Sequence, residues 1–504
     1  MKTKLFLILI FIGAIFVRFY QLNHLPGEWY GDISNVHEYV EEILNGKWPF
    51  YFFQSPGPVY HYLISPIALL LRSEGYLKYK IASVVVSILG IGAIFFLVKV
   101  ISGVKQALMS VVLISFSFWH LVFSRLGNSQ IIIPLQSAIF GYFIIQYTKR
   151  EKAQDLLLGG VSASLGLYTY PQTFIFPVIY LVLILMINLK NLKRGKISHF
   201  LTAILLILIF SLPFFQMIKK QKDLFTHGYV GEKIFSNNSN NSSDRIATFI
   251  RNYRITLSMF HFKGDGIFRV NIPEKPMLDR LSGILLIIGI LNLYIRNKKY
   301  LLLVLFITGV LLIPSSSPAI NRGEIPSSSR TIAVIPFLYF FIAEGLIWCG
   351  HYLSSRKMLN KLVSAGILSL FMAVISYSNL KTYYKDYPKV LPDDNLASGK
   401  FIADYLDKNY GVNLSVYFGS CCWGEWGQPE PKAIFYQMKE KKRKVEYSHY
   451  LDSCVEADKS PAVVVIGPSD AKLIEEYRDC FPLLFSKPVY DEKGKIIFRT
   501  INID

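Results

Sequence analysis

Charged residues are scarce in this chain, and acidic ones are the scarcer kind. Only 18% of the 504 residues are charged, and Lys and Arg outnumber Asp and Glu by 54 to 35. With 52% hydrophobic residues the chain is too apolar for one soluble domain, so the composition indicates a membrane-embedded protein. The formal net charge of +19 would suggest nucleic-acid binding in a soluble protein. Here the membrane explains most of that charge, and we expect no nucleic-acid partner.

The basic residues lie mainly in short clusters between apolar runs, of the kind that stays cytoplasmic. These are MKTK, KREK at 149–152, KNLKRGK at 190–196, RNKK at 296–299 and SSRKMLNK at 354–361. With the N-terminus cytoplasmic, about eleven apolar runs of spanning length place every cluster inside. The predicted spans are 4–20, 79–98, 105–123, 130–148, 154–170, 172–189, 199–218, 280–295, 300–314, 329–350 and 359–377.

One apolar run is left out of this count. PVYHYLISPIALLL, residues 58–71, is shorter and carries a His, two Tyr and two Pro. If it crossed the bilayer, all later basic clusters would move outside, so we expect an interfacial or re-entrant helix. We also expect the first span to be retained, because it lacks the small-residue cleavage site of a signal peptide.

After Tyr377 the sequence becomes richer in charged residues, and its apolar runs become short and alternating. We therefore predict a mainly α-helical, polytopic membrane domain over 1–380, with outer loops 21–78, 219–279 and 315–328, and an extracytoplasmic α/β domain over 381–504. In this tail LSVYFG, AVVVIG and KIIFRTI read as strands, and GKFIADYLDKNY and DAKLIEEYRDCF as helices. No Gly-rich phosphate loop follows either of the first two strands, which favours an acceptor-binding or packing domain over a nucleotide enzyme.

Cysteine is rare, and four of the five cysteines lie in this tail. One plausible disulfide pattern joins each of two adjacent cysteines to one of the two later ones, because adjacent cysteines rarely pair with each other. A zinc site is the alternative, although no CxxC spacing is present. The four are Cys421, Cys422, Cys454 and Cys480.

Motifs for metal-dependent catalysis are also missing. No HExxH occurs, and the outward loops lack the DxD spacing of many soluble sugar-nucleotide enzymes. A divalent metal is therefore not demanded, and positive side chains would have to stabilise a leaving phosphate.

The first outer loop offers a catalytic carboxylate, Asp32, in WYGDISNVHEYVEEILNG. Ser34 is a reasonable N-cap for a short amphipathic helix, which puts Asp32 just before a helix N-terminus near the membrane surface. Such a carboxylate, with aromatic residues limiting water, suits a general base; an acidic loop that merely caps a helix is the equal alternative. The later acids Glu38, Glu41 and Glu42 read as a solvated helix face.

Substrate-binding candidates gather on the same predicted side. Arg125 in WHLVFSRLG and Arg330 in SSSRTIAVIPF lie at outer ends of spans, where an Arg either holds a lipid phosphate or snorkels to the headgroups. The loop KGDGIFRVNIP adds two further cations. The remaining candidates are Lys263 and Arg269 in that loop, Tyr170 in the short turn YTYPQ, and His61.

The order of these motifs resembles a known family. An early Asp in the first outer loop, a helix ending NGKWPF, then SPGPVYHYLISPI, WHLVFSRLG, GLYTYPQTFIFP and SSSRTIAVIPFLYFFIAEGL are similar to polyprenyl-phosphate-dependent glycosyltransferases of fold class C. FKGDGIFRVNIPEKPMLDRLSGILLIIGIL also looks like a stretch common in prokaryotic members. Within that class the chain is closest to the protein O-mannosyltransferase and lipid A aminoarabinose transferase group, glycosyltransferase family 39 in the broad sense. The resemblance covers about residues 1–350.

The resemblance implies an inverting transfer on the outer face, from a sugar on a polyprenyl phosphate to an acceptor hydroxyl of a protein, lipid or glycan. Asp32 occupies the place of the family's presumed base. Members usually carry Asp-Glu there, whereas Ile33 follows here, and the family's acidic residue near SPGP is missing too. The missing acid leaves open a non-catalytic homologue that acts as a membrane binding or sensor protein. A transporter or flippase of lipid-linked glycans is the alternative from another functional class.

Overall fold

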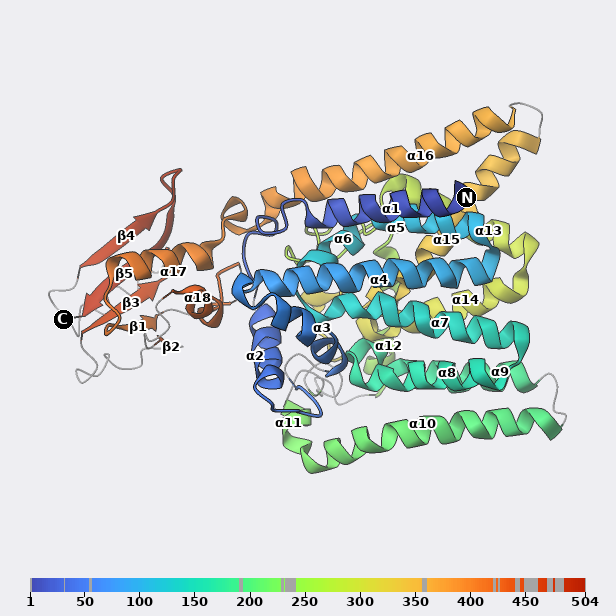
Figure 1. Ribbon diagram of the computed structural model, residues 1–504, viewed down its shortest axis with the longest axis horizontal. Coiled ribbons are helices and arrows are strands. Elements are labelled where there is room, and N and C mark those ends of the chain that lie inside the picture. Colours follow the sequence, from blue (N-terminus) through green and yellow to red (C-terminus); the bar gives the residue numbers. More distant parts are fainter. Residues whose placement is uncertain are drawn as a thin grey trace. The chain divides into compact units, whose positions relative to one another are not determined.

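The chain forms two compact units in a computed structural model (Figure 1). We call Met1–Leu22 with Val36–Tyr387 the helical unit, and Asn23–Asn35 with Pro388–Asp504 the tail unit. The sequence prediction kept all of 21–78 with the membrane domain, but Asn23–Asn35 belongs to the tail unit because hydrogen bonds hold it there. The structure describes residues 2–30, 32–53, 57–189, 194–227, 231, 242–355, 360–419, 423–424, 427–439, 445–447, 461–468, 475 and 485–503.

Long apolar helices make up most of the helical unit, as the hydropathy predicts. Of these helices α4, α7, α8 and α10 lie one beside the next (Figure 1). The bounds are α1 Lys2–Phe19, α2 Asp32–Leu44, α3 Val59–Leu70, α4 Leu77–Ser102, α5 Val104–Ser115, α6 Phe118–Arg125, α7 Ile132–Arg150, α8 Ala153–Ser164, α9 Phe176–Leu189, α10 Arg194–Lys220, α11 Lys222–His227, α12 Ser242–Ser258, α13 Arg280–Arg296, α14 Lys298–Leu311, α15 Ile335–Ser355 and α16 Lys361–Lys381.

Within the described residues, six helices are long and apolar enough to cross a membrane, or up to seven if the bent pair α5 and α6 is one span. Each of the eleven predicted spans overlaps a helix, but the count of eleven stays a prediction. The run left out of that count forms α3, a helix of only 12 residues with Pro66 inside it.

Apolar side chains on the outermost helices are exposed, which a bilayer explains. Only 28% of the apolar window of α10 and 17% of that of α16 is buried, against 89% for α15. In water such surfaces would expose large apolar patches, which soluble monomers rarely do. Hydrocarbon removes that cost, so these two helices suit contact with lipid.

The break between α5 and α6 bends the chain by 59° and is braced by polar groups from other helices. Arg18 on α1 donates to the Ser115 carbonyl at 2.8 Å, and Asn379 on α16 accepts the Phe118 amide hydrogen at 2.9 Å. Ser117 caps α6 by accepting from the His120 backbone N–H. Backbone groups freed by the break therefore find partners inside the protein, as they must in a low-dielectric setting.

The tail unit contains one mixed sheet, with strand order β2-β1-β3-β5-β4. Strand β1 pairs parallel with β2 and β3, whereas β5 is antiparallel to both β3 and β4. Helix α17 packs apolar residues such as Ile402 and Leu406 into the core beside Val463 and Phe498. The bounds are α17 Ser398–Asn409, β1 Ser415–Phe418, α18 Pro431–Gln437, β2 Val445–Tyr447, β3 Ala462–Ile466, β4 Ser486–Tyr490 and β5 Ile496–Ile503.

The predicted fold class, mainly α-helical with a small C-terminal α/β domain, is confirmed. The three predicted strands correspond to β1, β3 and β5, and the first predicted tail helix to α17. The sequence analysis missed β2, β4 and α18. The four tail cysteines lie outside the described residues, as does almost all of the second predicted tail helix.

Candidate functional site

Arg330 lies just before α15 and is only 7% exposed. Its guanidinium forms an ion pair with the carboxylate of Glu324, at the end of the short 3-10 helix η7 (Arg322–Glu324). Its backbone N–H also contacts the Ser327 hydroxyl at 3.4 Å. The segment NRGEIPSSSR thus folds back on itself and fixes the direction of this buried cation.

A second carboxylate, Asp265, fastens the same segment from another loop. It is fully buried, and it accepts hydrogen bonds from the Ser328 backbone N–H at 2.6 Å and the Ser328 hydroxyl at 2.7 Å. Its other oxygen accepts from the Ile267 backbone N–H at 2.8 Å. Burial raises the pKa of the Asp265 carboxyl, opposed by these hydrogen bonds and by the charge of Arg330. The KGDGIFRVNIP loop and the Arg330 segment are therefore held together.

Arg330 lines an apolar groove of about 360 Å³. Nearly all of its walls are hydrocarbon, and Gln172 is a polar group among them. The Gln172 side-chain oxygen is buried and has no hydrogen-bond partner among the described residues. The lining residues come from η4 (Pro171–Ile175), α12, η6 (Ile313–Ser316) and the segment after it: Pro171, Gln172, Phe174, Ile175, Phe249, Ile313, Pro314, Ser317, Pro318, Ile320 and Arg330. A hydrocarbon chain with an anionic end matches this combination of walls and cation.

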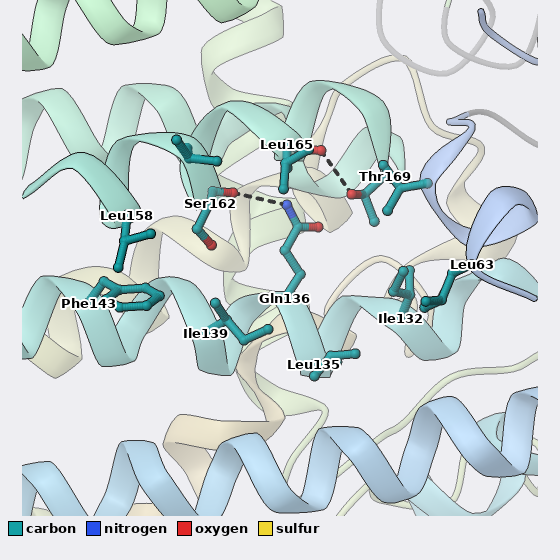
Figure 2. Close-up of a pocket in the computed structure, with 12 residues that line it drawn as sticks. Leu63, Ile132, Leu135, Gln136, Ile139, Phe143, Leu158, Ser162, Leu165 and Thr169 are labelled. Carbon is teal, nitrogen blue, oxygen red and sulfur yellow. Dashed lines mark hydrogen bonds between the residues drawn. The ribbon is translucent and has the colours of Figure 1, made fainter. Parts of the chain in front are cut away.

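A second groove, of about 290 Å³, lies between α3, α7 and α8 (Figure 2). Figure 2 shows Ile139 and Phe143 on α7 on one side of it, with Leu158 and Leu165 on the other. Gln136 donates to the Ser162 carbonyl at 3.2 Å, which satisfies its amide nitrogen within the wall. No charged side chain is among the described lining residues, so this groove offers no cation for a phosphate.

Asp32 is the first residue of α2 and is partly buried. The helix begins three residues earlier than predicted, so Ser34 is a buried residue inside its first turn and not the N-cap. A carboxylate in the first turn of a helix is favoured by the helix dipole. Asp32 belongs to the tail unit, whereas Arg330 and its groove belong to the helical unit.

Arg125 is the last residue of α6, and its contacts indicate what it does there. It is fully buried, and its guanidinium donates to the carbonyls of Val17, Arg18 and Tyr20 at 2.8 to 3.0 Å. These are carbonyls of the last turn of α1 and just beyond it, which a cation caps favourably. Arg125 also lies over the ring of Tyr383, with 5.2 Å to the centroid. We therefore assign it a structural role as the cap of α1 and leave it out of the proposed phosphate site.

The other predicted binding residues are spread over several places. Lys263 forms an ion pair with Glu274 at 2.7 Å, and both side chains are more than half exposed. Arg269, in the same loop, is half-buried, and its carbonyl accepts from the Tyr387 hydroxyl. Tyr170 is buried, directly before Pro171 in the chain, and its hydroxyl accepts from the Gln130 amide at 3.1 Å.

His61 lies inside an aromatic cluster on α3. It is fully buried, and its Nδ1 is 3.0 Å from the Gly57 carbonyl. The rings of Tyr39 and Phe52 contact it, with centroids 5.3 and 4.7 Å away. Burial lowers the pKa of His61 to about 4, so the ring is neutral at physiological pH and does not act as a cation for phosphate.

Sequence reasoning missed Glu324 and Gln172. Glu324 stands six residues before Arg330, and Gln172 ends the motif YTYPQ. Only the folded structure shows that Glu324 pairs with Arg330 and that Gln172 lines the same groove as Arg330. Within the described ranges, no three His, Cys, Asp or Glu side chains could together hold a metal ion. The expectation that no divalent metal is needed stays a prediction.

One family model matches part of the chain. The model for dolichyl-phosphate-mannose-protein mannosyltransferases matches residues 54–215, a minority of the sequence. No curated protein sequence matches the chain.

Solved structures match nearly its whole length. ArnT from Cupriavidus metallidurans bound to undecaprenyl phosphate is 13% identical, with a TM-score of 0.59, over 98% of this chain and 97% of that one. Archaeal oligosaccharyltransferase AglB from Archaeoglobus fulgidus, in complex with an inhibitory peptide and a dolichol-phosphate, is 10% identical, with a TM-score of 0.51, over 98% of this chain and 74% of that one. At these identities the likeness shows the fold. The chain thus has the fold of the class C glycosyltransferases it resembles, and together with the family match this indicates a glycosyltransferase.

Proposed function

From the fold and family match of a membrane glycosyltransferase, we propose that this chain transfers a sugar from a polyprenyl-phosphate donor to an acceptor hydroxyl on the outer face of the membrane. The observation that carries the proposal is the buried Arg330 beside an apolar groove. A polyprenyl phosphate offers the matching pair of features, since its chain is hydrocarbon and its head is anionic. ArnT and AglB have been solved with such lipids bound, which supports this donor class.

In the structure the Arg330 guanidinium is already paired with the Glu324 carboxylate. We propose that the donor phosphate competes with Glu324 for the guanidinium, because both anions need the same N–H donors. The Gln172 amide oxygen is then an acceptor for a sugar hydroxyl close to the phosphate. The pair therefore holds the cation in place until a donor arrives.

The chemical step is a single displacement at the anomeric carbon. Asp32 takes the proton of the acceptor hydroxyl, and the acceptor oxygen forms a bond to the anomeric carbon. The bond from that carbon to the phosphate oxygen breaks, and its electron pair leaves with the polyprenyl phosphate. Arg330 stabilises the charge of that leaving group. One displacement inverts the anomeric configuration.

The membrane orientation supports a lipid-linked donor. With the basic clusters cytoplasmic, the loops that carry Asp32 and Arg330 and the tail unit face outside. Sugar nucleotides are cytoplasmic, so a transfer outside needs a sugar that crosses on a lipid. The acceptor is a protein, a lipid or another glycan in this outer compartment.

The test incubates purified protein with polyprenyl-phosphate sugars and measures free carrier phosphate, transfer product and donor affinity. We expect Asp32→Asn to abolish transfer and leave donor binding and membrane insertion unchanged. Arg330→Gln should weaken donor binding about tenfold or more, because it removes a charge-assisted contact. Glu324→Gln should strengthen donor binding, since it removes the competing charge but keeps a hydrogen-bond acceptor.

Arg322→Gln is the matched control, because Arg322 is an exposed cation in the same segment. It should change neither binding nor transfer. A fully active Asp32→Asn variant would remove the assigned base, and unchanged donor affinity in Arg330→Gln would remove the assigned groove. Movement of the intact donor across a bilayer without release of carrier phosphate would instead favour a flippase.

A further inference from the structure

The segment that carries Asp32 is part of the tail unit although it stands near the start of the chain. After Leu22 the chain leaves the helical unit, and it returns at Val36, inside α2. The residues between Leu22 and Val36 are held by hydrogen bonds to residues of the tail unit that follow position 390. Two sets of hydrogen bonds form this tether.

The first set centres on Asn395. Its side-chain oxygen accepts from the Gly27 backbone N–H at 2.7 Å, and its side-chain nitrogen donates to the His24 carbonyl at 2.8 Å. Asn395 has a φ of +68°, a left-handed conformation that Asn tolerates better than most residues. A Cβ at Gly27 would lie 2.2 Å from the Asn395 carbonyl oxygen, so the two backbones touch.

The second set centres on Glu28, which is only 4% exposed. One carboxylate oxygen accepts from the Gly399 backbone N–H at 2.7 Å, and the other accepts from the Trp29 backbone N–H at 2.8 Å. Gly399 lies in the first turn of α17, where backbone N–H groups have no partner within the helix. A buried carboxylate needs such donors, and the helix dipole favours a negative charge there.

The geometry points to Glu28 and Asn395 as positioning residues for the general base. This inference rests on the proposed function. Glu28 stands four residues before Asp32. The stretch of chain between the two residues is therefore too short to absorb much movement. With Gly27 and Glu28 fixed to the tail unit, the backbone that presents the Asp32 carboxylate is fixed at its N-terminal side as well as by α2. Glu28 and Asn395 act through Asp32 and are not themselves catalytic residues.

The experiment compares Glu28→Ala, Glu28→Gln and Asn395→Ala in the full-length protein, with kcat expressed per donor-binding site. We expect kcat to fall about tenfold or more in the two alanine variants, because misplacing a reacting group by about 1 Å can reduce the rate by about a hundredfold. The donor KM should stay unchanged, since Arg330 belongs to the helical unit. Glu28→Gln keeps one accepting oxygen and should recover part of the rate. Amide exchange should quicken over 24–33 in every variant.

Lys493→Ala is the control, because it breaks an exposed ion pair with Asp394, next to Asn395, without touching the tether. It should leave kcat and exchange unchanged. Normal kcat in both alanine variants despite faster exchange would overturn the inference, and so would a loss of kcat without faster exchange. If a substitution reduces the fraction of folded protein, kcat still compares the variants fairly, because it is expressed per donor-binding site. An inactive Asp32→Asn beside fully active tether variants rejects only the tether, whereas an active Asp32→Asn rejects the base itself.

Discussion

Lys78, a buried cation on α4, has its partner on another helix. Its amine lies 3.0 Å from the Glu41 carboxylate on α2, with side-chain exposures of 4% and 26%. Burial raises the pKa of Glu41, but the hydrogen bond and charge of Lys78, together with the nearby His37 and Arg72, outweigh it, and the pKa ends below its ordinary value. Glu41 is therefore not part of a merely solvated face, as the sequence pattern suggested. It joins α2 to α4.

The lowered pKa gives this pair a defined pH dependence. A carboxyl whose pKa is lower in the folded state stabilises that state above its unfolded pKa, near 4.5, and loses this contribution as pH falls through the folded pKa. We expect Glu41→Gln to reduce the free energy of unfolding by about 1 kcal/mol at neutral pH, as for a partly exposed pair, and by progressively less as the pH falls below about 4.5. Thermal unfolding across pH 3–7 measures it. A destabilisation that stays constant across this pH range would contradict the assignment.

Two arginines with the same sequence context show where residue-level prediction stops. Arg125 and Arg330 both stand at the predicted outer end of a span, and hydropathy gives no basis for telling them apart. Their partners differ: Arg125 donates to carbonyls more than 100 residues earlier in the chain, whereas Arg330 pairs six residues away and lines a groove. Long-range partners are set by packing, so the sequence could nominate both residues but could not assign their roles.

At the scale of helices, α13 and α15 make a backbone contact through glycine. A Cβ at Gly289 would lie 1.8 Å from the Phe341 carbonyl oxygen, and one at Gly345 would lie 2.1 Å from that of Leu285. Small residues allow this approach where no hydrophobic effect drives helices together in lipid. The buried pair of Asn292 and Glu344 adds a hydrogen bond of 3.1 Å across the same two helices.

Because of this contact, we expect that adding a single methyl group at Gly289 will destabilise the protein. Gly289→Ala should lower the stability by about 1–3 kcal/mol, as overpacking does, because the added carbon meets backbone that cannot move aside. Gly366→Ala on α16 is the control, since nothing lies within 4 Å of its Cβ position, and it should be neutral or slightly stabilising. Thermal unfolding in detergent compares them. Equal stability of the two variants would show that α13 and α15 are not in close contact.

The sequence predicts an element when the element's own residues carry the hydrophobic pattern, and misses it when pairing with neighbours defines it. Long apolar helices and the buried strands β1, β3 and β5 carry it in their own residues. Strand β4, SKPVY, contains Pro488 and lies at the edge of the sheet, where a proline is tolerated, and its pairing with β5 is what makes it a strand. Strand β2 is only three residues long. Both depend on neighbours that local periodicity does not encode.

For the whole molecule, the basic clusters predict one orientation in the membrane. We expect a cysteine at Lys493, an exposed position in the tail unit, to react with a membrane-impermeant maleimide in intact cells. A cysteine at the exposed Lys152, between α7 and α8, should react only after permeabilisation. The wild-type chain gives the background from its native cysteines. The reverse labelling pattern would invert the topology and move the proposed reaction to the cytoplasm.

The discontinuous tail unit has a consequence for biosynthesis. Gly27 and Asn395 are separated by 368 residues, so the ribosome releases one side of the tether long before it makes the other. Contacts between such distant residues form late, because a long loop must close first. Throughout translation, the nascent chain therefore carries Asp32 on a segment whose anchor does not yet exist. Under the proposed roles, the Asp32 carboxylate can be positioned for catalysis only after Asn395 and helix α17 have been synthesised.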